Sequence, residues 1–122
     1  MKRRPALDRP PLAASAAGLR LDGLARALSS CGDEAELRRF LVDLCTPAEL
    51  EALSDRWAVV PELAEGRAYR DIHDRTGVSV TTIGRVARCL ALGSGGYRVA
   101  AERLGHLAPG AALTLHGVDD AH

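Results

Sequence analysis

The chain has 122 residues, 47% of them hydrophobic, and its 16 basic and 16 acidic side chains give a formal net charge of zero. This length accommodates one domain and leaves no room for a second sizeable core. No apolar run approaches the roughly 18–20 residues that a membrane-spanning helix needs. Asp8 and three prolines interrupt any signal-peptide core near the start of the chain. We therefore expect a cytoplasmic protein.

The charges are distributed unevenly along the chain. Residues 1–20 hold five basic and one acidic side chain, residues 21–65 hold four basic and ten acidic ones, and residues 66–105 hold seven basic and three acidic ones. A basic excess on two segments suits contact with the phosphates of nucleic acid. Ordinary solvated charge is the alternative.

The sequence contains no motif that supports catalysis or metal binding. The three cysteines, Cys31, Cys45 and Cys89, form no CxxC pair, and we expect buried thiols rather than disulfide or zinc ligands. The four histidines share no ligand spacing with them. Without a nucleophile–base set, a metal cluster or a phosphate-binding loop, we expect neither an enzyme nor a metalloprotein.

Both ends of the chain lack helical periodicity. Residues 1–17 contain three prolines and predict a disordered basic arm. The cations of this arm could follow a DNA backbone or simply keep the chain soluble. Residues 106–122 have no usable pattern and predict a flexible tail.

Two amphipathic helices are expected after the arm, over residues 18–30 and 33–45. Asp33 is a plausible N-cap of the second helix, with Glu36 as its capping-box partner. The apolar positions are Leu19, Leu21, Leu24 and Leu28 in the first helix and Leu37, Phe40, Leu41 and Leu44 in the second. One small domain cannot cover faces this apolar, so we expect them to pair with a second copy of the chain.

A longer third helix is expected from Thr46 to about Gly66. Thr46-Pro47 followed by Glu49 is typical of a helix start, and Gly66 is typical of a stop. The positions expected to face inward are Leu50, Leu53, Trp57, Val60 and Ala64.

Residues 68–92 have the pattern of a helix-turn-helix. A short helix over residues 68–75 leads to a turn at Gly77, and Ser79 opens a second helix over residues 80–92. With Ile72 and Val78, the inward positions expected on the second helix are Val80, Ile83, Val86, Ala87 and Leu90. The opposite side carries Thr81, Thr82, Gly84, Arg85 and Arg88.

The outward side chains suit the base edges and phosphates of duplex DNA. Threonine can meet bases through its hydroxyl or methyl group, and arginine can pair with guanine or phosphate. The positive helix end near Ser79 favours a phosphate, and the first helix would cross the DNA backbone. The candidate DNA-binding residues are Arg70, Arg75, Ser79, Val80, Thr81, Thr82, Arg85 and Arg88. A helical module that binds an acidic protein through the same face is the alternative function.

A last short helix is expected over residues 97–104. Its apolar side is expected to carry Val99, Ala100 and Leu104. The sequence therefore predicts an all-α chain of six helices with no convincing strand.

A series of short matches over residues 44–97 points to one family. The matching pieces are Thr46-Pro47, Glu51-Ala52-Leu53 followed by Arg56, Glu65-Gly66, Thr76-Gly77, Thr82-Ile83 followed by Arg85, Cys89-Leu90 and Gly95-Gly96-Tyr97. In these pieces the chain resembles the YerC/YecD branch of the Trp repressor family. The resemblance implies a Trp-repressor-like helical domain over residues 18–105 and an intertwined homodimer whose recognition helices enter successive major grooves. It also implies a bacterial, nucleoid-associated transcriptional regulator of the repressor type.

The resemblance further bears on a small-molecule effector. In Trp repressor, L-tryptophan binds between the long helix and the recognition helix, and the matching positions here are Thr46, Arg56 and Arg85. Those three residues are a candidate ligand pocket. However, Val86 stands where the family's pocket has a small glycine, which narrows the space for an indole ring. We expect no cofactor, with L-tryptophan or another small amino-acid-like effector as the alternative.

Overall fold

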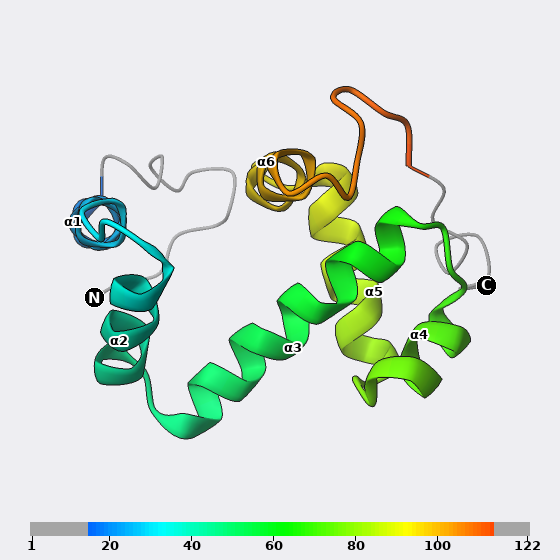
Figure 1. Cartoon of the computed structure of the whole chain (residues 1–122), viewed down its shortest axis with the longest axis horizontal. Coiled ribbons are helices and arrows are strands. Elements are labelled where there is room, and N and C mark those ends of the chain that lie inside the picture. Colours follow the sequence, from blue (N-terminus) through cyan, green and yellow to red (C-terminus); the bar gives the residue numbers. More distant parts are fainter. Residues whose placement is uncertain (1–14, 114–122) are drawn as a thin grey trace. The chain divides into compact units, whose positions relative to one another are not determined.

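The computed structural model describes residues 15–113, which contain six α-helices and no strand, as expected (Figure 1). The helices are α1 (Ala16–Ser29), α2 (Glu34–Leu44), α3 (Pro47–Ala64), α4 (Tyr69–Thr76), α5 (Val80–Leu92) and α6 (Gly96–Arg103). Residues 1–14 of the predicted arm and 114–122 of the predicted tail lie outside the described residues. Within residues 15–113, no helix combines the length and apolarity needed to cross a membrane.

Side-chain caps set where α1 and α2 begin. Ser15 Oγ accepts a hydrogen bond from the Gly18 amide at 2.9 Å, and α1 therefore starts two residues before the predicted boundary. Asp33 caps α2 as predicted, because its carboxylate accepts from the Glu36 amide at 2.9 Å. The Glu36 carboxylate accepts from the Gly32 amide rather than from that of Asp33, so the capping box is shifted by one residue.

The end of α3 is a Schellman turn at Gly66. The amide of Arg67 donates to the carbonyl of Glu62 at 3.3 Å, and the amide of Gly66 donates to the carbonyl of Leu63 at 2.9 Å. Gly66 has a φ of 79°, which glycine adopts without a steric cost. The predicted stop at Gly66 is confirmed, and it turns the chain toward α4.

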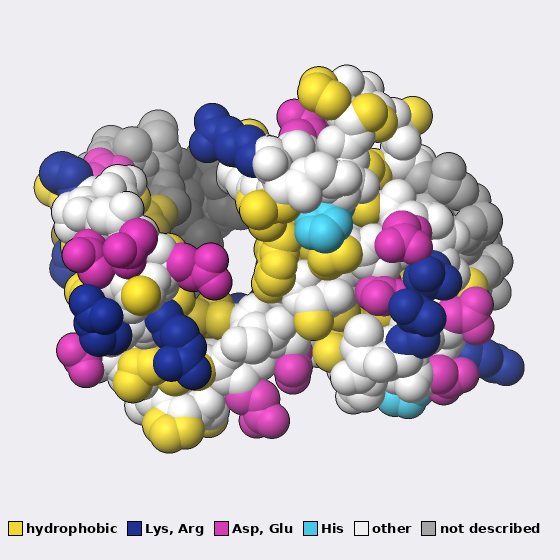
Figure 2. All heavy atoms as spheres, in the orientation of Figure 1, with side chains coloured by type: hydrophobic (Ala, Val, Ile, Leu, Met, Phe, Trp, Pro, Cys, Tyr) yellow, Lys and Arg dark blue, Asp and Glu magenta, His cyan; other side chains and the backbone are white. Residues whose placement is uncertain are grey.

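The described residues form two compact units, one ending at Thr46 and one beginning at Pro47. In the first unit, Gly18 is the only buried residue among residues 15–46. Its most exposed large apolar side chains are Leu19 at 65%, Val42 at 53%, and Leu21 and Leu44 at 48% each. Figure 2 shows hydrophobic atoms at the molecular surface. A single copy of the chain therefore leaves much of the apolar surface of α1 and α2 in water.

The second unit contains the hydrophobic core. Helix α3 packs against α4, α5 and α6, and α5 also packs against α4 and α6 (Figure 1). The buried core residues are Val59, Val60, Leu63, Ile72, Val78, Ile83, Val86, Ala87, Leu90, Ala101 and Leu107. Trp57, Ala64, Tyr69, Tyr97 and Leu113 pack against this core and are partly buried.

The predicted buried face was right in part on α3 and wrong on α6. On α3, Val60 is buried as predicted, but Leu53 is 43% exposed and Leu63 is buried. Apolar residues occur all around this helix, so periodicity could not select the side that meets α4 and α5. On α6, Val99 and Leu104 are 44% and 64% exposed and Ala101 faces the core instead, because a helix this short gives a weak periodic signal.

The first residues of the predicted tail fold back onto the core. After α6, the amides of His106 and Leu107 both donate to the carbonyl of Ala101, at 2.8 and 3.3 Å. This turn returns Leu107 to the core, where it is 7% exposed. His106 lies edge-on to Trp57, with 6.3 Å between ring centroids. The chain is thus held against the core beyond residue 105.

Candidate nucleic-acid interface

The turn between α4 and α5 has the three residues Gly77, Val78 and Ser79. Gly77 has a φ of 77° and its amide donates to the carbonyl of His73 at 2.8 Å, which ends α4. The Thr76 hydroxyl donates to the Ile72 carbonyl at 2.7 Å and accepts from the Val78 amide at 3.1 Å. These bonds fix the angle between the two helices, and they confirm the predicted helix-turn-helix.

Two further side chains hold the turn. Nδ1 of His73 lies 2.7 Å from the Val78 carbonyl, so the imidazole must carry a proton on Nδ1 to donate. Ser79 Oγ accepts from the Thr82 amide at 3.1 Å and donates to the Thr82 hydroxyl at the same distance. Ser79 is therefore the N-cap of α5.

Replacing Gly77 with alanine should lower the free energy of unfolding by about 1–2 kcal/mol. A Cβ at this position would meet no atom within 4 Å, so the cost is backbone strain at positive φ alone. Urea unfolding measures it. Gly96→Ala is the matched control, because its Cβ also enters open space and its φ is not positive. If the two variants were equally stable, backbone strain at Gly77 would not be the cause of the loss.

Helix α5 presents one buried and one exposed side. Ile83, Val86, Ala87 and Leu90 are all at most 4% exposed, as predicted. Val80 was predicted to face inward as well, but it is 50% exposed. It is the first helical residue, and its side chain lies beyond the edge of the core on the side of α4. Cys89 is also exposed, contrary to the expectation of a buried thiol, because it falls on the outer side of α5.

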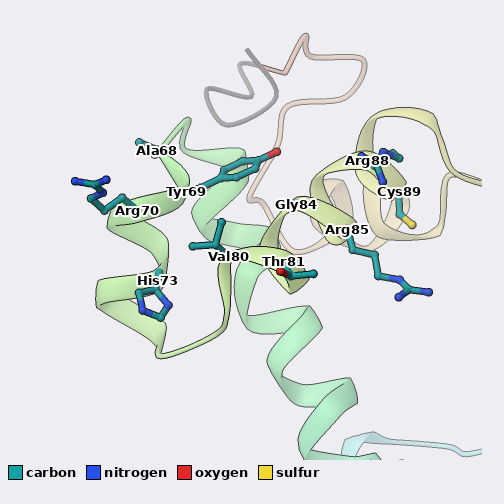
Figure 3. Close-up of a pocket in the computed structure, with 10 residues that line it drawn as sticks. All are labelled: Ala68, Tyr69, Arg70, His73, Val80, Thr81, Gly84, Arg85, Arg88 and Cys89. Atoms are coloured by element: carbon teal, nitrogen blue, oxygen red, sulfur yellow. The ribbon is translucent and has the colours of Figure 1, made fainter. Parts of the chain in front are cut away.

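A groove of about 910 Å³ lies between α4 and the outer side of α5 (Figure 3). The lining residues come from α4 and its preceding residue and from α5: Ala68, Tyr69, Arg70, His73, Val80, Thr81, Gly84, Arg85, Arg88 and Cys89. This lining has three arginines and no acidic residue, so the groove is electropositive. Figure 3 shows that Arg70 and Arg85 extend away from the groove in opposite directions.

Tyr69 forms part of the floor of the groove. A Cβ built on Gly84 would lie 3.7 Å from Tyr69 Cε2, so the aromatic ring lies across α5 at its only internal glycine. The Tyr69 hydroxyl is buried and has no hydrogen-bond partner among the described residues. Burial raises the pKa of Tyr69, and the charge of Arg88 opposes this shift. The ring therefore stays neutral at physiological pH.

Arg75 is held by α3 at one edge of the helix-turn-helix. Its Nε lies 2.7 Å from Oε1 of Glu62, and Nε of Arg67 lies 3.0 Å from the same oxygen. The hydrogen bond and charge of Glu62 raise the pKa of Arg75 above its usual value, so the guanidinium is charged throughout the physiological range. This shared carboxylate ties α4 to the C-terminal end of α3.

Replacing Glu62 with glutamine should lower Tm by about 2–5 °C at low salt. The Glu62 side chain is only 18% exposed, and two guanidinium groups would lose their common negative partner. In 1 M salt the difference from wild type should shrink, because the two arginine side chains are 34% and 52% exposed and salt screens their charges. Glu65→Gln is the control, since the Glu65 side chain is 61% exposed and contacts only Arg67 in the ion pairs of the described residues. A Glu62 variant that matches this control at both salt concentrations would rule out the anchoring role.

The structure places the candidate DNA-binding residues on one helix-turn-helix but gives them different surroundings. Arg70, Val80, Thr81, Arg85 and Arg88 line the groove. The Ser79 and Thr82 hydroxyls bond to each other at the start of α5, and Arg75 pairs with Glu62. The assignment of all eight residues to DNA contact remains a prediction.

The candidate ligand pocket also remains a prediction. Arg85 lines the groove, whereas Arg56 is an exposed residue of α3 outside its lining. Thr46 belongs to the N-terminal unit. Within residues 15–113, no group of three His, Cys, Asp or Glu side chains could hold a metal ion.

Sequence reasoning missed Tyr69 and the groove itself. Tyr69 and Gly84 meet across the turn, and only the folded turn brings these distant positions together. The one available signal was a glycine inside a helix, which often marks close approach of another group.

Comparisons with known proteins agree with this architecture. Residues 19–105 match the family described as Trp repressor protein. The chain is 41% identical over 87 residues to YerC of Bacillus subtilis strain 168, an uncharacterised protein, covering 71% of this chain and 84% of YerC.

Two crystal structures are also similar. A TrpR-like protein from Eubacterium eligens ATCC 27750 superposes with a TM-score of 0.67 at 42% identity, covering 73% of this chain and 92% of that one. A candidate Trp repressor from Staphylococcus aureus gives a TM-score of 0.66 at 34% identity, covering 71% and 87%. The family match spans both the helix-turn-helix and the preceding helices, and the chain therefore belongs to the Trp repressor family.

Proposed function

We propose that this protein is a sequence-specific DNA-binding transcriptional regulator of the repressor type that acts as a homodimer. The observation that carries the proposal is the acid-free groove of the helix-turn-helix, with its three arginines on two helices. Membership in the Trp repressor family supports the same reading.

The outer side of α5 offers the chemistry that base recognition needs. Arg85 and Arg88 are exposed and can pair with guanine or with phosphate oxygens. Thr81 is exposed in the first turn of α5, the part of a recognition helix that meets base edges. Arg70 lies on α4, where a helix-turn-helix crosses the DNA backbone. With helix 80–92 in the major groove, these groups would be distributed between bases and phosphates.

The uncovered apolar surface of α1 and α2 supports the homodimer. Four large side chains there are between 48% and 65% exposed, which is costly for a protein that remains a monomer. A dimer with two-fold symmetry would present two recognition helices to half-sites about 34–36 Å apart. We place the shared interface on α1 and α2.

The proposed regulator works without L-tryptophan. Val86 is 1% exposed and belongs to the core that α5 shares with α3. This side chain fills the inner side of α5 next to Arg85, so we expect no indole ring to enter on that side. We therefore propose DNA binding that does not require a tryptophan corepressor.

Selection of genomic DNA fragments by the full-length protein, with and without added amino acids, tests the proposed function. We expect enrichment of a palindromic motif whose half-sites are one helical turn apart, and the same motif in both arms. If the selected fragments share no motif, binding is not sequence-specific. If a motif is enriched only in the presence of L-tryptophan, the protein uses tryptophan as a corepressor.

A salt titration with random duplex DNA separates this function from a module that binds an acidic protein. Neutralised phosphates release counterions, so log affinity should fall steeply with log salt. A flat dependence, or no binding at low salt, would favour the protein-interaction module.

A further inference from the structure

Val80 is the only large aliphatic side chain in the lining of a groove whose charged residues are all arginines. Nine large apolar side chains are exposed among the described residues, and Val80 is the only one of them that lines the groove. Single exposed apolar residues are common on protein surfaces. This one is set between the arginines of α4 and α5, at the position where a recognition helix first meets DNA.

The surroundings of Val80 leave its outer side available to a partner. Gly84, one turn later on the same side of α5, has no side chain to cover it. The nearest side-chain atom to a Cβ at Gly84 would be Tyr69 Cε2 at 3.7 Å, an ordinary contact. Val80, Gly84 and the Tyr69 ring thus form a small apolar strip along the groove floor (Figure 3).

We propose that Val80 reads thymine, through contact of its methyl groups with the C5-methyl group of a thymine in the major groove. This inference rests on the proposed function and adds the chemistry of one base position to it. The thymine methyl is the apolar group that the major-groove edges of the bases display. The arginines around the strip would bring the duplex onto it by binding phosphates and guanines.

The strip favours a methyl group over a polar base edge for a physical reason. A cytosine amino group or a guanine carbonyl that faced Val80 would lose water without gaining a hydrogen bond, which is unfavourable. Thr81 also has a methyl group, but its hydroxyl sits on the same carbon and retains water or a polar base atom. Val80 therefore discriminates by apolar contact, and its neighbour does not.

Thymine-to-deoxyuridine substitution in the selected operator tests the proposal, because it removes only the C5-methyl group. Each thymine is replaced in turn, and binding is measured by fluorescence anisotropy. At one position per half-site, we expect wild-type affinity to fall about three- to fivefold, as for one buried methyl group. The Val80→Ala variant should bind the thymine operator less tightly by a similar factor and should be insensitive to deoxyuridine at that position.

The controls distinguish misfolding of the variant, a methyl contact made by Thr81, and a lack of DNA binding. Val80→Ala should fold normally, because the residue is half-exposed and alanine favours helices, and an unchanged Tm confirms it. Thr81→Ala should keep the deoxyuridine sensitivity of wild type. Loss of that sensitivity in Thr81→Ala but not in Val80→Ala would assign the methyl contact to Thr81 and overturn the proposal. The proposal is also overturned if the wild-type protein binds the operator tightly and its affinity is unchanged by every deoxyuridine substitution. If the wild-type protein binds no DNA, the proposed function itself is wrong.

Discussion

Replacing Leu19 and Val42 together by aspartate should convert the dimer into monomers. In a lone chain these side chains are 65% and 53% exposed, so two aspartates would cost little. In the proposed dimer the same positions lie in an apolar interface, where an unpaired carboxylate is strongly unfavourable. Sedimentation velocity should show the mass fall from twice the chain mass of 12.9 kDa to 12.9 kDa. DNA affinity should fall with it, because one helix-turn-helix would then bind alone.

The control variant keeps the positions apolar. Leu19→Met with Val42→Ile nearly preserves volume and hydrophobicity, so this protein should remain a dimer and bind DNA like wild type. A monomeric wild type, or an aspartate variant that remains dimeric with unchanged stability, would remove α1 and α2 from the interface. In that case the exposed apolar residues of α3 and α6 would be the next surface to test.

Local sequence signals were enough to predict where α2 and α5 begin and where α3 and α4 end. Asp33 and Ser79 cap their helices through side-chain oxygens, and Gly66 and Gly77 end theirs at positive φ. These effects act over three to five residues, which is the range that a sequence displays directly. The helix-turn-helix was predictable for the same reason, since its turn depends on local bonds.

The choice of buried side was less predictable where partners come from distant segments. Helix α3 is apolar on several sides, and which side is buried depends on the positions of α4, α5 and α6. Leu53 is exposed and Leu63 is buried for that reason. Leu107 seemed part of a patternless tail, yet two hydrogen bonds to Ala101 return it to the core.

The candidate site shows the same division. The exposed threonine and arginines of α5 followed from helical periodicity, whereas the groove depends on contact between Tyr69 and Gly84 across the turn. Val80 shows where helical periodicity fails. Its periodicity placed it inward, and the structure shows that the core ends at Ile83 and leaves Val80 half-exposed.

Replacing Arg85 with alanine should weaken binding to the selected operator by about 10- to 100-fold. Arg85 is exposed, lines the groove, and belongs to none of the ion pairs among the described residues. Its guanidinium is therefore available to pair bidentately with guanine. Binding competition between the operator and single-base variants should show that discrimination at one guanine is lost. Arg103→Ala on α6 removes the same charge outside the groove and should change affinity little.

Arg85→Lys separates base reading from charge. Lysine retains the positive charge but lacks the planar fork that matches guanine, so we expect an unchanged salt dependence and reduced discrimination at that guanine. Arg70→Ala should behave in the opposite way. It should weaken binding to all sequences alike and lower the slope of log affinity against log salt by about one, as for a phosphate contact. If Arg85→Lys matched wild type at every base pair while Arg85→Ala lowered only the salt slope, Arg85 would be a phosphate contact, and base reading would have to come from Arg88, Thr81 and Val80.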